Sequence, residues 1–482
     1  MRLFKHTLKK FIAFLPLQWQ RYIYYQYQYI HFLPSLCLLK IRLKILPAIG
    51  DSFKQGKSSR KKFNNKLNKE HSPKRKLIFR DLNKSQFLVD SLPYPSTHEY
   101  KLNGLKPVGT LKIRLAILNE VAPKFFSGHN FLDIGCNKGF FSLLAAESFD
   151  RVQSIDTDER FIKLCRFLKQ PNMDIFHTSF RDFAPQLEFD KIFIGNVHHY
   201  IFKECRGWEW ISKLAAISRG EVLIEGPVDM NCKDMISVIP EDLQLKFTFE
   251  KFMQVMESFF SLEQKVPSVS PGRWAMLFRR KVDKFDRRIQ LHSLPILRIF
   301  KKDKNSIVFL TKIESQRVIA KIYENSVRDL RIRINIARFS PISNDVIGSV
   351  YHNERFVGWL EEYMDYSSYN YKENQIKLFK LICDHTIFLA KLGYFDCDCA
   401  TINFFKNSNK LFDKGSIFPL KIIDENTYGD SINRYNQGSY FIHLNQSYDI
   451  ISKDIQKDIY KALKSKDPYI IETTFSKIKR QL

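Results

Sequence analysis

A glycine-spaced turn between two apolar segments constrains the fold of this chain more than any other stretch. The apolar run Phe131–Ile134 predicts a buried strand, Gly135–Gly139 predicts a turn, and Phe140–Ala146 predicts a helix. Glycines let the backbone approach a ligand where a Cβ would clash, and a helix start offers N–H groups that have no intrahelical partner. The three segments together therefore predict a pocket for a nucleotide-like ligand.

An acid beside this turn indicates which ligand it suits. The turn lacks the G-x-G-x-x-G pattern of dinucleotide sites. Asp133 stands at the carboxyl end of the predicted strand, where its charge repels a pyrophosphate and favours a ligand with a cationic amino group. S-adenosylmethionine (SAM) rather than NAD is therefore the predicted cofactor. The cofactor-binding residues predicted here are Asp133, Gly135, Cys136, Asn137 and Gly139.

The segment resembles the first motif of class I methyltransferases, hydrophobic-Asp-x-Gly-x-x-x-Gly, and further motifs follow in the family's order over residues 107–281. A second predicted strand ends in Asp156, which lies 156 − 133 = 23 positions after Asp133. That spacing is close to the ~20 residues at which such an acid reaches ribose hydroxyls in doubly wound folds. The resemblance implies a Rossmann-like α/β sheet and three further cofactor-binding residues, Ser179, Phe180 and Asn196.

Two adjacent histidines, His198 and His199, are the predicted catalytic residues of this half. A histidine with a pKa of ~6.5 can deprotonate an acceptor hydroxyl, and as an imidazolium it can hold a phosphate. Alternatively, one or both rings only cap the loop. Methyl transfer often needs little beyond positioning, because the sulfonium is already activated. Glu225, at the end of a predicted fifth strand, is a further pocket candidate.

Two later segments complete this half. Residues 228–268 depart from a minimal α/β unit. Their methionine and phenylalanine side chains could form a lid or a wall of the acceptor site. At such spacing, however, these side chains more often belong to the core. Residues 273–280 predict a late antiparallel strand that closes the sheet.

A second constellation begins near residue 296. Predicted strands at residues 296–300, 306–310 and 317–323 precede a helical stretch, a further strand and a long helix at residues 378–392. This order resembles the α+β kinase-like fold, and within it the small bacterial sugar and lipopolysaccharide kinases.

Four residues carry that resemblance. Asp398 and Asn403 have the spacing of H-R-D-x-x-x-x-N, and Asp424 stands where the metal-binding Asp of D-F-G stands. Lys321 matches the V-A-I-K lysine. The resemblance implies that Asp398 is catalytic, that Asn403 and Asp424 are Mg²⁺ ligands, and that Lys321 contacts the phosphates of ATP.

The kinase-like half also departs from the family's pattern. No histidine precedes the catalytic loop, and Lys301–Asn305 replace a glycine-rich loop. Asp329 stands where the helix glutamate that pairs with Lys321 is usual, and Glu425 and Asn426 follow Asp424. An active kinase and an inactive nucleotide-binding or structural domain therefore both remain open.

The positive charge is concentrated in an N-terminal arm. The net charge is +26, and residues 1–80 hold 19 Lys/Arg against Asp51 and Glu70, which leaves +9 for the rest of the chain. Aromatic and aliphatic side chains alternate with these cations. The arm suits an anionic membrane surface, a nucleic acid, or a small helical cap on the next domain.

Composition also bears on location. The eight cysteines include no C-x-x-C pair, which is typical of reduced thiols. The arm predicts neither a transmembrane helix nor a secretory signal, because charged residues and glutamines interrupt its apolar runs. We therefore expect a cytoplasmic protein, with peripheral attachment to the inner membrane as an option.

The expected organisation has four parts: residues 1–76 (basic arm and linker), 77–282 (methyltransferase), 290–432 (kinase-like) and 433–482 (helical tail). Residues 77–106 are expected to form a lead-in that covers the cofactor pocket, and residues 450–464 to form a solvated terminal helix, with pairing to another chain as the alternative. This order resembles bifunctional chain terminators of bacterial O-antigen synthesis, in which a kinase phosphorylates the end sugar and a methyltransferase methylates that phosphate. The resemblance implies a glycan or lipid-linked saccharide as partner. The alternatives are a nucleic-acid methyltransferase that binds RNA through the arm, and a kinase-like half that serves only as a scaffold.

Overall fold

The computed structural model describes residues 75–79, 81–92, 98–232, 235–270, 272–302, 306–323, 329–340, 343, 345–363, 375–396, 417–420 and 452–482. The chain divides into two compact units, Met1–Pro73 and Lys74–Leu482, and every described residue belongs to the second. The predicted basic arm therefore lies outside the described residues, apart from its last two positions. Within the described ranges, no helix has the length and apolarity that crossing a membrane requires.

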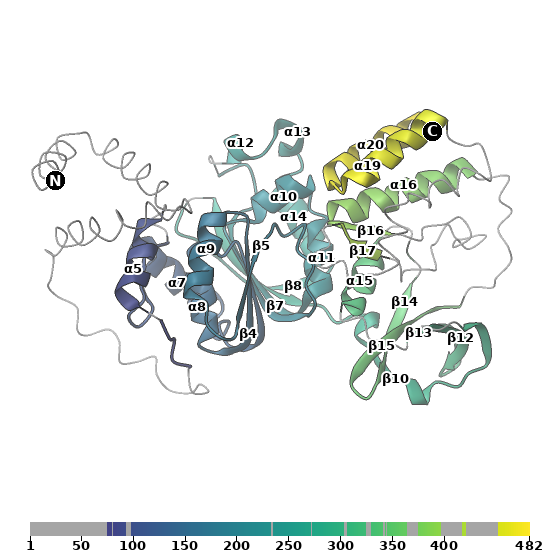
Figure 1. Ribbon diagram of the computed structural model, residues 1–482, viewed down its shortest axis with the longest axis horizontal. Coiled ribbons are helices and arrows are strands. Elements are labelled where there is room, and N and C mark those ends of the chain that lie inside the picture. Colours follow the sequence, from purple (N-terminus) through teal and green to yellow (C-terminus); the bar gives the residue numbers. More distant parts are fainter. Residues whose placement is uncertain are drawn as a thin grey trace, which may run out of the picture. The chain divides into compact units, whose positions relative to one another are not determined.

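A seven-stranded sheet organises the first half of the described chain (Figure 1). Its order is β5-β4-β3-β6-β7-β9-β8, in which β9 is antiparallel to both neighbours and the other pairs are parallel. This is the Rossmann-like α/β sheet that the sequence predicts. The strands are β3 (Gly128–Ile134), β4 (Phe149–Asp156), β5 (Met173–His177), β6 (Phe189–Gly195), β7 (Ser218–Pro227), β8 (Phe260–Pro267) and β9 (Arg273–Arg280).

Helices cover both faces of this sheet, with α7, α8 and α9 on one side and α10, α11 and α14 on the other (Figure 1). The strands are consequently almost continuous apolar runs, as parallel strands buried on both faces are. In β3, Phe131 packs into the core with α8, and Leu132 packs into the core on the opposite face. The helices are α7 (Gly109–Val121), α8 (Phe140–Ala146), α9 (Glu159–Leu168), α10 (His198–Cys205), α11 (Trp210–Ile217) and α14 (Phe249–Glu257).

Two expectations for the far edge of the sheet were wrong in detail. Strand β9 does not close the sheet, because β8 pairs with its outer side. The same pairing shows that residues 260–267 are a sheet strand and not part of an insertion. The remainder of that segment forms short helices whose side chains Phe252, Met253 and Met256 are buried in the core, as the commoner alternative held.

A second sheet of six strands follows, in the order β10-β14-β15-β13-β12-β11. All of its pairs are antiparallel except β10 with β14. The predicted strands at residues 306–310 and 317–323 correspond to β12 and β13. The elements are β10 (Arg288–Gln290), β11 (Arg298–Lys302), β12 (Ser306–Ile313), β13 (Gln316–Tyr323), α15 (Leu330–Ala337), β14 (Val346–His352) and β15 (Arg355–Glu362).

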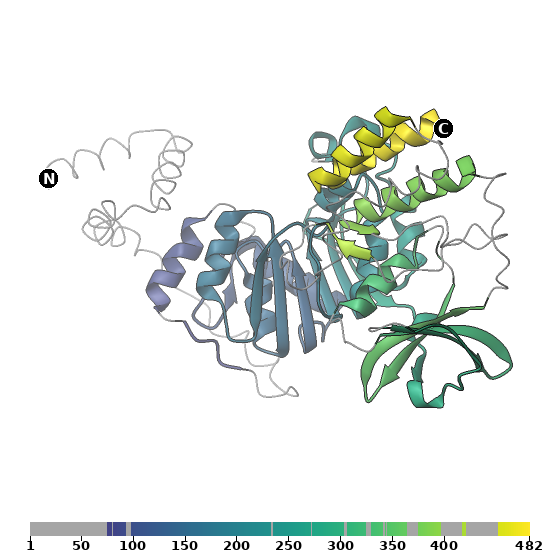
Figure 2. The same cartoon turned by 45° about the vertical axis from the view of Figure 1, so that its right-hand side comes forward.

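Three helices form the last core of the chain. The two C-terminal helices, α19 (Lys453–Ser465) and α20 (Pro468–Gln481), lie beside α16 (Gln375–Lys391) in both views (Figures 1 and 2). Ile459 and Leu463 of α19 are buried in the core with Phe475 of α20. The expectation of a solvated terminal helix was therefore wrong, because its apolar stripe is covered by neighbouring helices.

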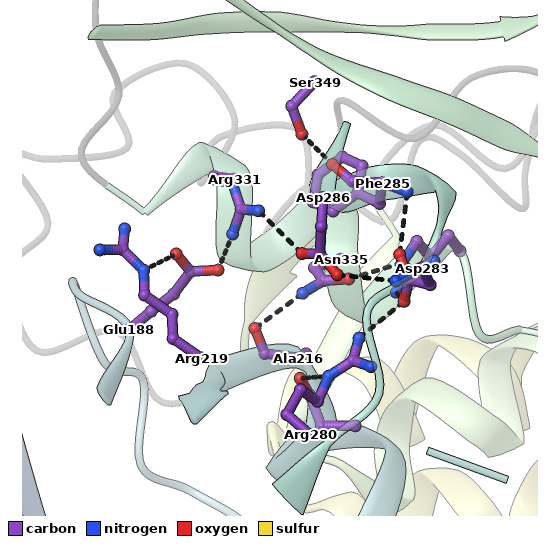
Figure 3. A network of polar contacts seen from close by, with 12 residues as sticks. Glu188, Ala216, Arg219, Arg280, Asp283, Phe285, Asp286, Arg331, Asn335 and Ser349 are labelled. Carbon is purple, nitrogen blue, oxygen red and sulfur yellow. Dashed lines mark hydrogen bonds and ion pairs between the residues drawn. The ribbon is translucent and has the colours of Figure 1, made fainter. Parts of the chain in front are cut away.

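Helix α15, which lies between β13 and β14 in the chain, is joined to the first half by a shared core and by a polar network (Figure 3). Ile332 and Ile336 of α15 pack with the apolar side chains of α11. Beside them, Asn335 donates from Nδ2 to the carbonyl oxygen of Ala216 over 2.8 Å. The buried carboxylate of Glu188 bridges two guanidiniums, Arg219 at 2.7 Å and Arg331 of α15. Helix α15 is thus fixed to the first sheet where β6 and β7 begin.

A second contact between the two halves surrounds Lys213 of α11. Its Nζ donates to the carbonyl oxygens of Arg181 (2.7 Å) and Leu392 (2.9 Å), and it lies over the ring of Tyr394. Gly393, between Leu392 and Tyr394, has a φ of +76°. A Cβ at this position would lie 2.1 Å from the carbonyl oxygen of Arg181. The end of α16 is therefore packed directly on Arg181, which follows the predicted cofactor-binding residues Ser179 and Phe180.

Lys213 predicts a measurable pH dependence of stability. Burial lowers its pKa to about 7, whereas the unfolded chain keeps this lysine protonated up to ~10.4. Above about pH 7 the unfolded state therefore binds more protons than the folded state, so the contribution of Lys213 to the free energy of unfolding rises with pH. Its slope is at most about 1.4 kcal/mol per pH unit. Urea unfolding of the parent and of Lys213→Met at several pH values above neutrality is expected to diverge in this direction; parallel profiles would contradict the assignment.

Candidate cofactor and acceptor site

The glycine turn links the end of β3 to the start of α8, and its backbone is left-handed at three positions: Gly135 (φ +77°), Asn137 (φ +49°) and Gly139 (φ +79°). A Cβ at Gly135 would lie 2.4 Å from Cγ1 of Val197, and one at Gly139 would lie 2.9 Å from the Cys165 sulfur. Both glycines are therefore required by backbone conformation and by close neighbours from the protein itself.

Asp156, at the end of β4, holds the turn in place. Its Oδ2 accepts a hydrogen bond from the Asn137 N–H (2.8 Å), and its Oδ1 accepts one from the Asp158 N–H (2.9 Å). Burial raises the pKa of Asp156 above its usual value, although these N–H donors oppose the rise. The acid that the sequence identified by spacing thus organises the turn, and its role as a ribose ligand stays a prediction.

The site lies at a switch in the topology of the sheet. Strands β3 and β6 are neighbours, but the chain leaves β3 toward β4 and β5 and returns to β6 on the other side. Crevices for ligands in open α/β sheets form beyond the carboxyl ends of the strands at such a point. Here the glycine turn follows β3 and Asn196 follows β6, so the predicted cofactor residues flank the switch point.

Asp133 is buried beneath the turn, with 1% of its surface exposed. Ser142 of α8 donates to its Oδ2 over 2.5 Å, and Ser154 of β4 donates to the Ser142 hydroxyl over 2.9 Å. Burial raises the pKa of Asp133 to about 7. The carboxyl therefore ties β3 to the first turn of α8, a role that the sequence argument did not foresee.

A buried polar network lies at the ends of β6, β7 and β9. Arg114 of α7 donates to Glu225 from Nε (3.0 and 3.1 Å) and from its Nη2 (2.7 Å), and Ser268 donates to Glu225 Oε1 over 2.7 Å. Arg273, the first residue of β9, donates to Oδ1 of Asn196 over 2.6 Å. Sequence reasoning selected Asn196 and Glu225 but missed their partners, since residues as far apart as Arg114 and Glu225 share no local pattern.

His198 and His199 differ from the expectation of titrating bases. Both rings are buried, and burial lowers their pKa values to about 4 and about 2. Nε2 of His198 is hydrogen-bonded to the carbonyl oxygen of Pro227. Both rings are therefore neutral at pH 7, so the imidazolium that would hold a phosphate is not formed. The Nδ1 atoms of both are buried and have no hydrogen-bond partner in the described part of the chain.

Of the remaining predicted cofactor residues, Phe180 and Cys136 are buried and Ser179 is partly exposed. Phe180 is buried and meets Trp210 edge-to-face, with 6.0 Å between ring centroids, so its ring belongs to the core instead of lining an adenine pocket. Ser179 accepts from the Asp182 N–H through its hydroxyl (3.2 Å). Cys136 is also buried, with its sulfur 3.8 Å from that of Cys165. The side chains of Phe180 and Cys136 thus pack inside the protein, and the role of Ser179 as a cofactor ligand stays a prediction.

Residues before the sheet cover the turn, as was expected of residues 77–106. The hydroxyl of Tyr100 donates to the carbonyl oxygen of Lys138 in the turn over 2.6 Å. Nζ of Lys138 in turn donates to the carbonyl oxygen of Val89 over 3.0 Å. Burial lowers the pKa of the nearby His98 to about 3, and Arg114 and Lys138 act in the same direction. These contacts give the turn a fixed outer wall.

The structure describes only one residue of the predicted phosphotransfer site. Lys321 of β13 is buried, and its Nζ lies 3.5 Å from Glu361 Oε2 on the neighbouring strand β15. Asp329 forms an ion pair with Arg333, one turn along α15, at 3.2 Å. Glu361 was not identified from the sequence as a partner of Lys321. Asp398, Asn403 and Asp424 lie outside the described residues, so their roles stay predictions.

Comparison with known proteins assigns the first half to an enzyme class. Residues 132–212 match a family model described as a methyltransferase domain, a span that includes the glycine turn, Asp156 and Asn196. The chain therefore carries a SAM-dependent methyltransferase domain, as the sequence predicts. No curated protein matches the chain.

Several solved structures resemble parts of the chain at low identity. The N-methyltransferase NodS from Bradyrhizobium japonicum is 18% identical with a TM-score of 0.29, over 35% of this chain and 95% of that one. Magnesium protoporphyrin IX methyltransferase (ChlM) from Synechocystis PCC 6803 is 14% identical with a TM-score of 0.28, over 36% and 83%. The bifunctional kinase-methyltransferase WbdD is 17% identical with a TM-score of 0.30, over 83% and 95%.

Proposed function

We propose that this methyltransferase binds SAM at the glycine turn and methylates an oxygen of a bacterial polysaccharide or lipid-linked glycan. The observation that carries the cofactor assignment is the hydrogen bond from the Asn137 N–H to Asp156. It closes the left-handed turn at the sheet's switch point and places a carboxylate beside it. That carboxylate can accept hydrogen bonds from a ribose, as acids do at the same place in other doubly wound folds.

In the proposed reaction, the main task of the protein is to orient the acceptor oxygen toward the methyl group of SAM. Bound SAM supplies an activated methyl group, so the acceptor oxygen needs no strong base if it belongs to a phosphate. The buried, neutral His198 and His199 agree with a site that positions an acceptor instead of deprotonating it. Arg273, partly exposed at the start of β9, supplies positive charge at the same edge. An anionic acceptor such as a sugar phosphate suits this combination.

A second, ATP-dependent activity would supply that phosphate. Its support is the buried Lys321–Glu361 pair of the second sheet, together with the spacing of Asp398, Asn403 and Asp424 in the sequence. In kinases the lysine that contacts the ATP phosphates is paired with a glutamate on the αC helix; here the carboxylate that pairs with Lys321 lies on strand β15. In this proposal the second domain uses ATP and Mg²⁺ to phosphorylate a terminal sugar, and the first domain methylates the phosphate.

The test is double labelling of one acceptor. The purified full chain is incubated with SAM labelled in its methyl group, ATP labelled in its γ-phosphate, Mg²⁺, and either lipid-linked bacterial glycans or RNA. Both labels on the glycan are expected, with methylation dependent on ATP. Methyl label on the glycan without ATP would remove the kinase step and keep the methyltransferase. Methyl label on RNA alone would favour the alternative function.

Substitution of Asp156 tests the cofactor site separately from the acceptor. Asp156→Ala removes acceptors for two N–H groups and is expected to weaken SAM binding at least about tenfold, since charge-assisted hydrogen bonds are worth ~1.5–3 kcal/mol each. Asp174→Ala removes an exposed acid from the neighbouring strand β5 and serves as the matched control. Equal affinities of the two variants, at equal thermal stability, would refute the role of Asp156.

A further inference from the structure

An exposed edge strand of the second sheet has the composition of a lipid-binding surface. β11 is the last strand in the order of its sheet and pairs only with β12 among the described strands. All five of its residues, Arg298–Lys302, are exposed. Edge strands usually carry polar side chains or are covered, so an exposed apolar edge needs an explanation.

The apolar side chains are concentrated here. Ile296 and Leu297 are 57% and 52% exposed, and Ile299 and Phe300 are 50% and 42% exposed. Four large apolar residues within five positions make this the densest such run in the part of the chain that the structure describes. The side chains of Ile299 and Phe300 are therefore both open to solvent at the middle of the strand, beside the exposed Ile296 and Leu297.

The charge of this stretch has one sign. No Asp or Glu occurs from Arg287 to Lys302 in the sequence. On the neighbouring strand β12, the residue opposite Arg298 is Leu310 and the residue opposite Lys302 is Ile307, and both are apolar. The strand therefore combines exposed cations with exposed apolar side chains, which is the pairing that anionic lipid surfaces select: phosphates meet the cations, and the apolar side chains enter the acyl boundary.

Pairing with a further strand fits the edge less well. The register of β11 shifts between Ile299 and Lys301, so the ladder is irregular at the middle of the strand. A partner strand would lose regular hydrogen bonds at that point. A second copy of the same edge would also bring like charges together, which is unfavourable. A membrane surface requires neither a regular ladder nor a shaped groove.

We propose that the β11 edge, defined as residues 296–302, docks the second domain on an anionic membrane surface. This contact is separate from the N-terminal arm and independent of the methyl-transfer proposal. It would hold the second domain against the surface of the bilayer.

Hydrogen–deuterium exchange locates the contact directly. The full chain is mixed with phosphatidylcholine vesicles that contain or lack phosphatidylglycerol, and exchange of peptides covering residues 296–302 is followed. Protection of this segment with the anionic vesicles only is the expected result. Unchanged exchange in protein that sediments with those vesicles would overturn the proposal, because another segment would then carry the binding. Protection by an acidic strand-forming peptide of alternating Glu and Val, and not by vesicles, would also overturn it in favour of a protein partner.

Substitutions separate this edge from the arm. The double variant Ile299→Ser/Phe300→Ser is expected to lose the protection and, in sedimentation, to bind anionic vesicles at least about fivefold more weakly, from the lost apolar insertion. Leu245→Ser, which changes a residue that is 85% exposed beside Lys246 in the first half, is the matched control and is expected to bind as the parent does. Thermal unfolding confirms that each variant is folded. Equal binding and equal protection in the parent and the folded double variant would contradict the assignment.

Discussion

Gly135→Ala is expected to weaken SAM binding at least about tenfold and to lower the free energy of unfolding by about 2–5 kcal/mol. Two costs add. Alanine in the left-handed region costs ~1–2 kcal/mol, and a methyl group forced into a packed site costs ~1–3 kcal/mol. The second cost arises because the new Cβ would lie 2.4 Å from Cγ1 of Val197. Calorimetric SAM titration and urea unfolding measure the two effects.

Gly104 provides a matched control for the backbone cost alone. Its φ is +72°, and the nearest atom to an added Cβ is the flexible Lys106 Cε at 3.4 Å. Gly104→Ala is therefore expected to cost only ~1–2 kcal/mol and to leave SAM affinity unchanged. Adding Val197→Ala to Gly135→Ala should recover part of the lost stability, since it removes the clashing methyl groups. A Gly135→Ala variant as stable as Gly104→Ala would show that the turn is not packed as described.

Breaking the Arg114–Glu225 pair is expected to have the other large effect. Both side chains are almost fully buried, and Arg114 also lies over the Phe141 ring at 5.6 Å. Arg114→Met leaves a buried carboxylate whose remaining described donor is Ser268. Removal of one partner of a buried pair typically costs ~3–5 kcal/mol. The double variant Arg114→Met/Glu225→Leu is expected to be more stable than either single variant, because no buried charge remains.

An exposed ion pair on the same sheet serves as the control for this loss of stability. Arg151 and Asp174 lie 3.0 Å apart with side chains 49% and 36% exposed. Arg151→Met is expected to cost less than ~1 kcal/mol, as surface pairs do. Urea unfolding of the four variants gives the comparison. Similar losses for Arg114→Met and Arg151→Met would mean that the network beside Asn196 is open to water.

The sequence predicted the elements around the turn closely because their signals are local. The helix Phe140–Ala146 has the bounds that were expected, since a glycine precedes it and apolar residues fill it. Asp156 was found because the spacing between two strand ends is set by one intervening helix. The turn, its strand and its acid therefore needed no tertiary information.

The errors came from interactions between distant residues. Strand β8 was missed because five consecutive residues after Phe260 are exposed, so it shows no apolar alternation. The C-terminal helix α19 was expected to be solvated because nothing in its sequence shows that α16 and α20 cover it. The pKa values of His198 and His199 depend on the burial that α10 creates, and this too is invisible in a linear pattern.

The most direct test of this account is calorimetric titration of SAM into the full chain, its Asp156→Ala variant and the Asp174→Ala control. One binding site in the parent and the control is expected, with affinity reduced at least about tenfold in Asp156→Ala. Absence of binding in folded parent protein, or unchanged affinity in folded Asp156→Ala, would contradict the claim that the glycine turn held by this carboxylate is the cofactor site.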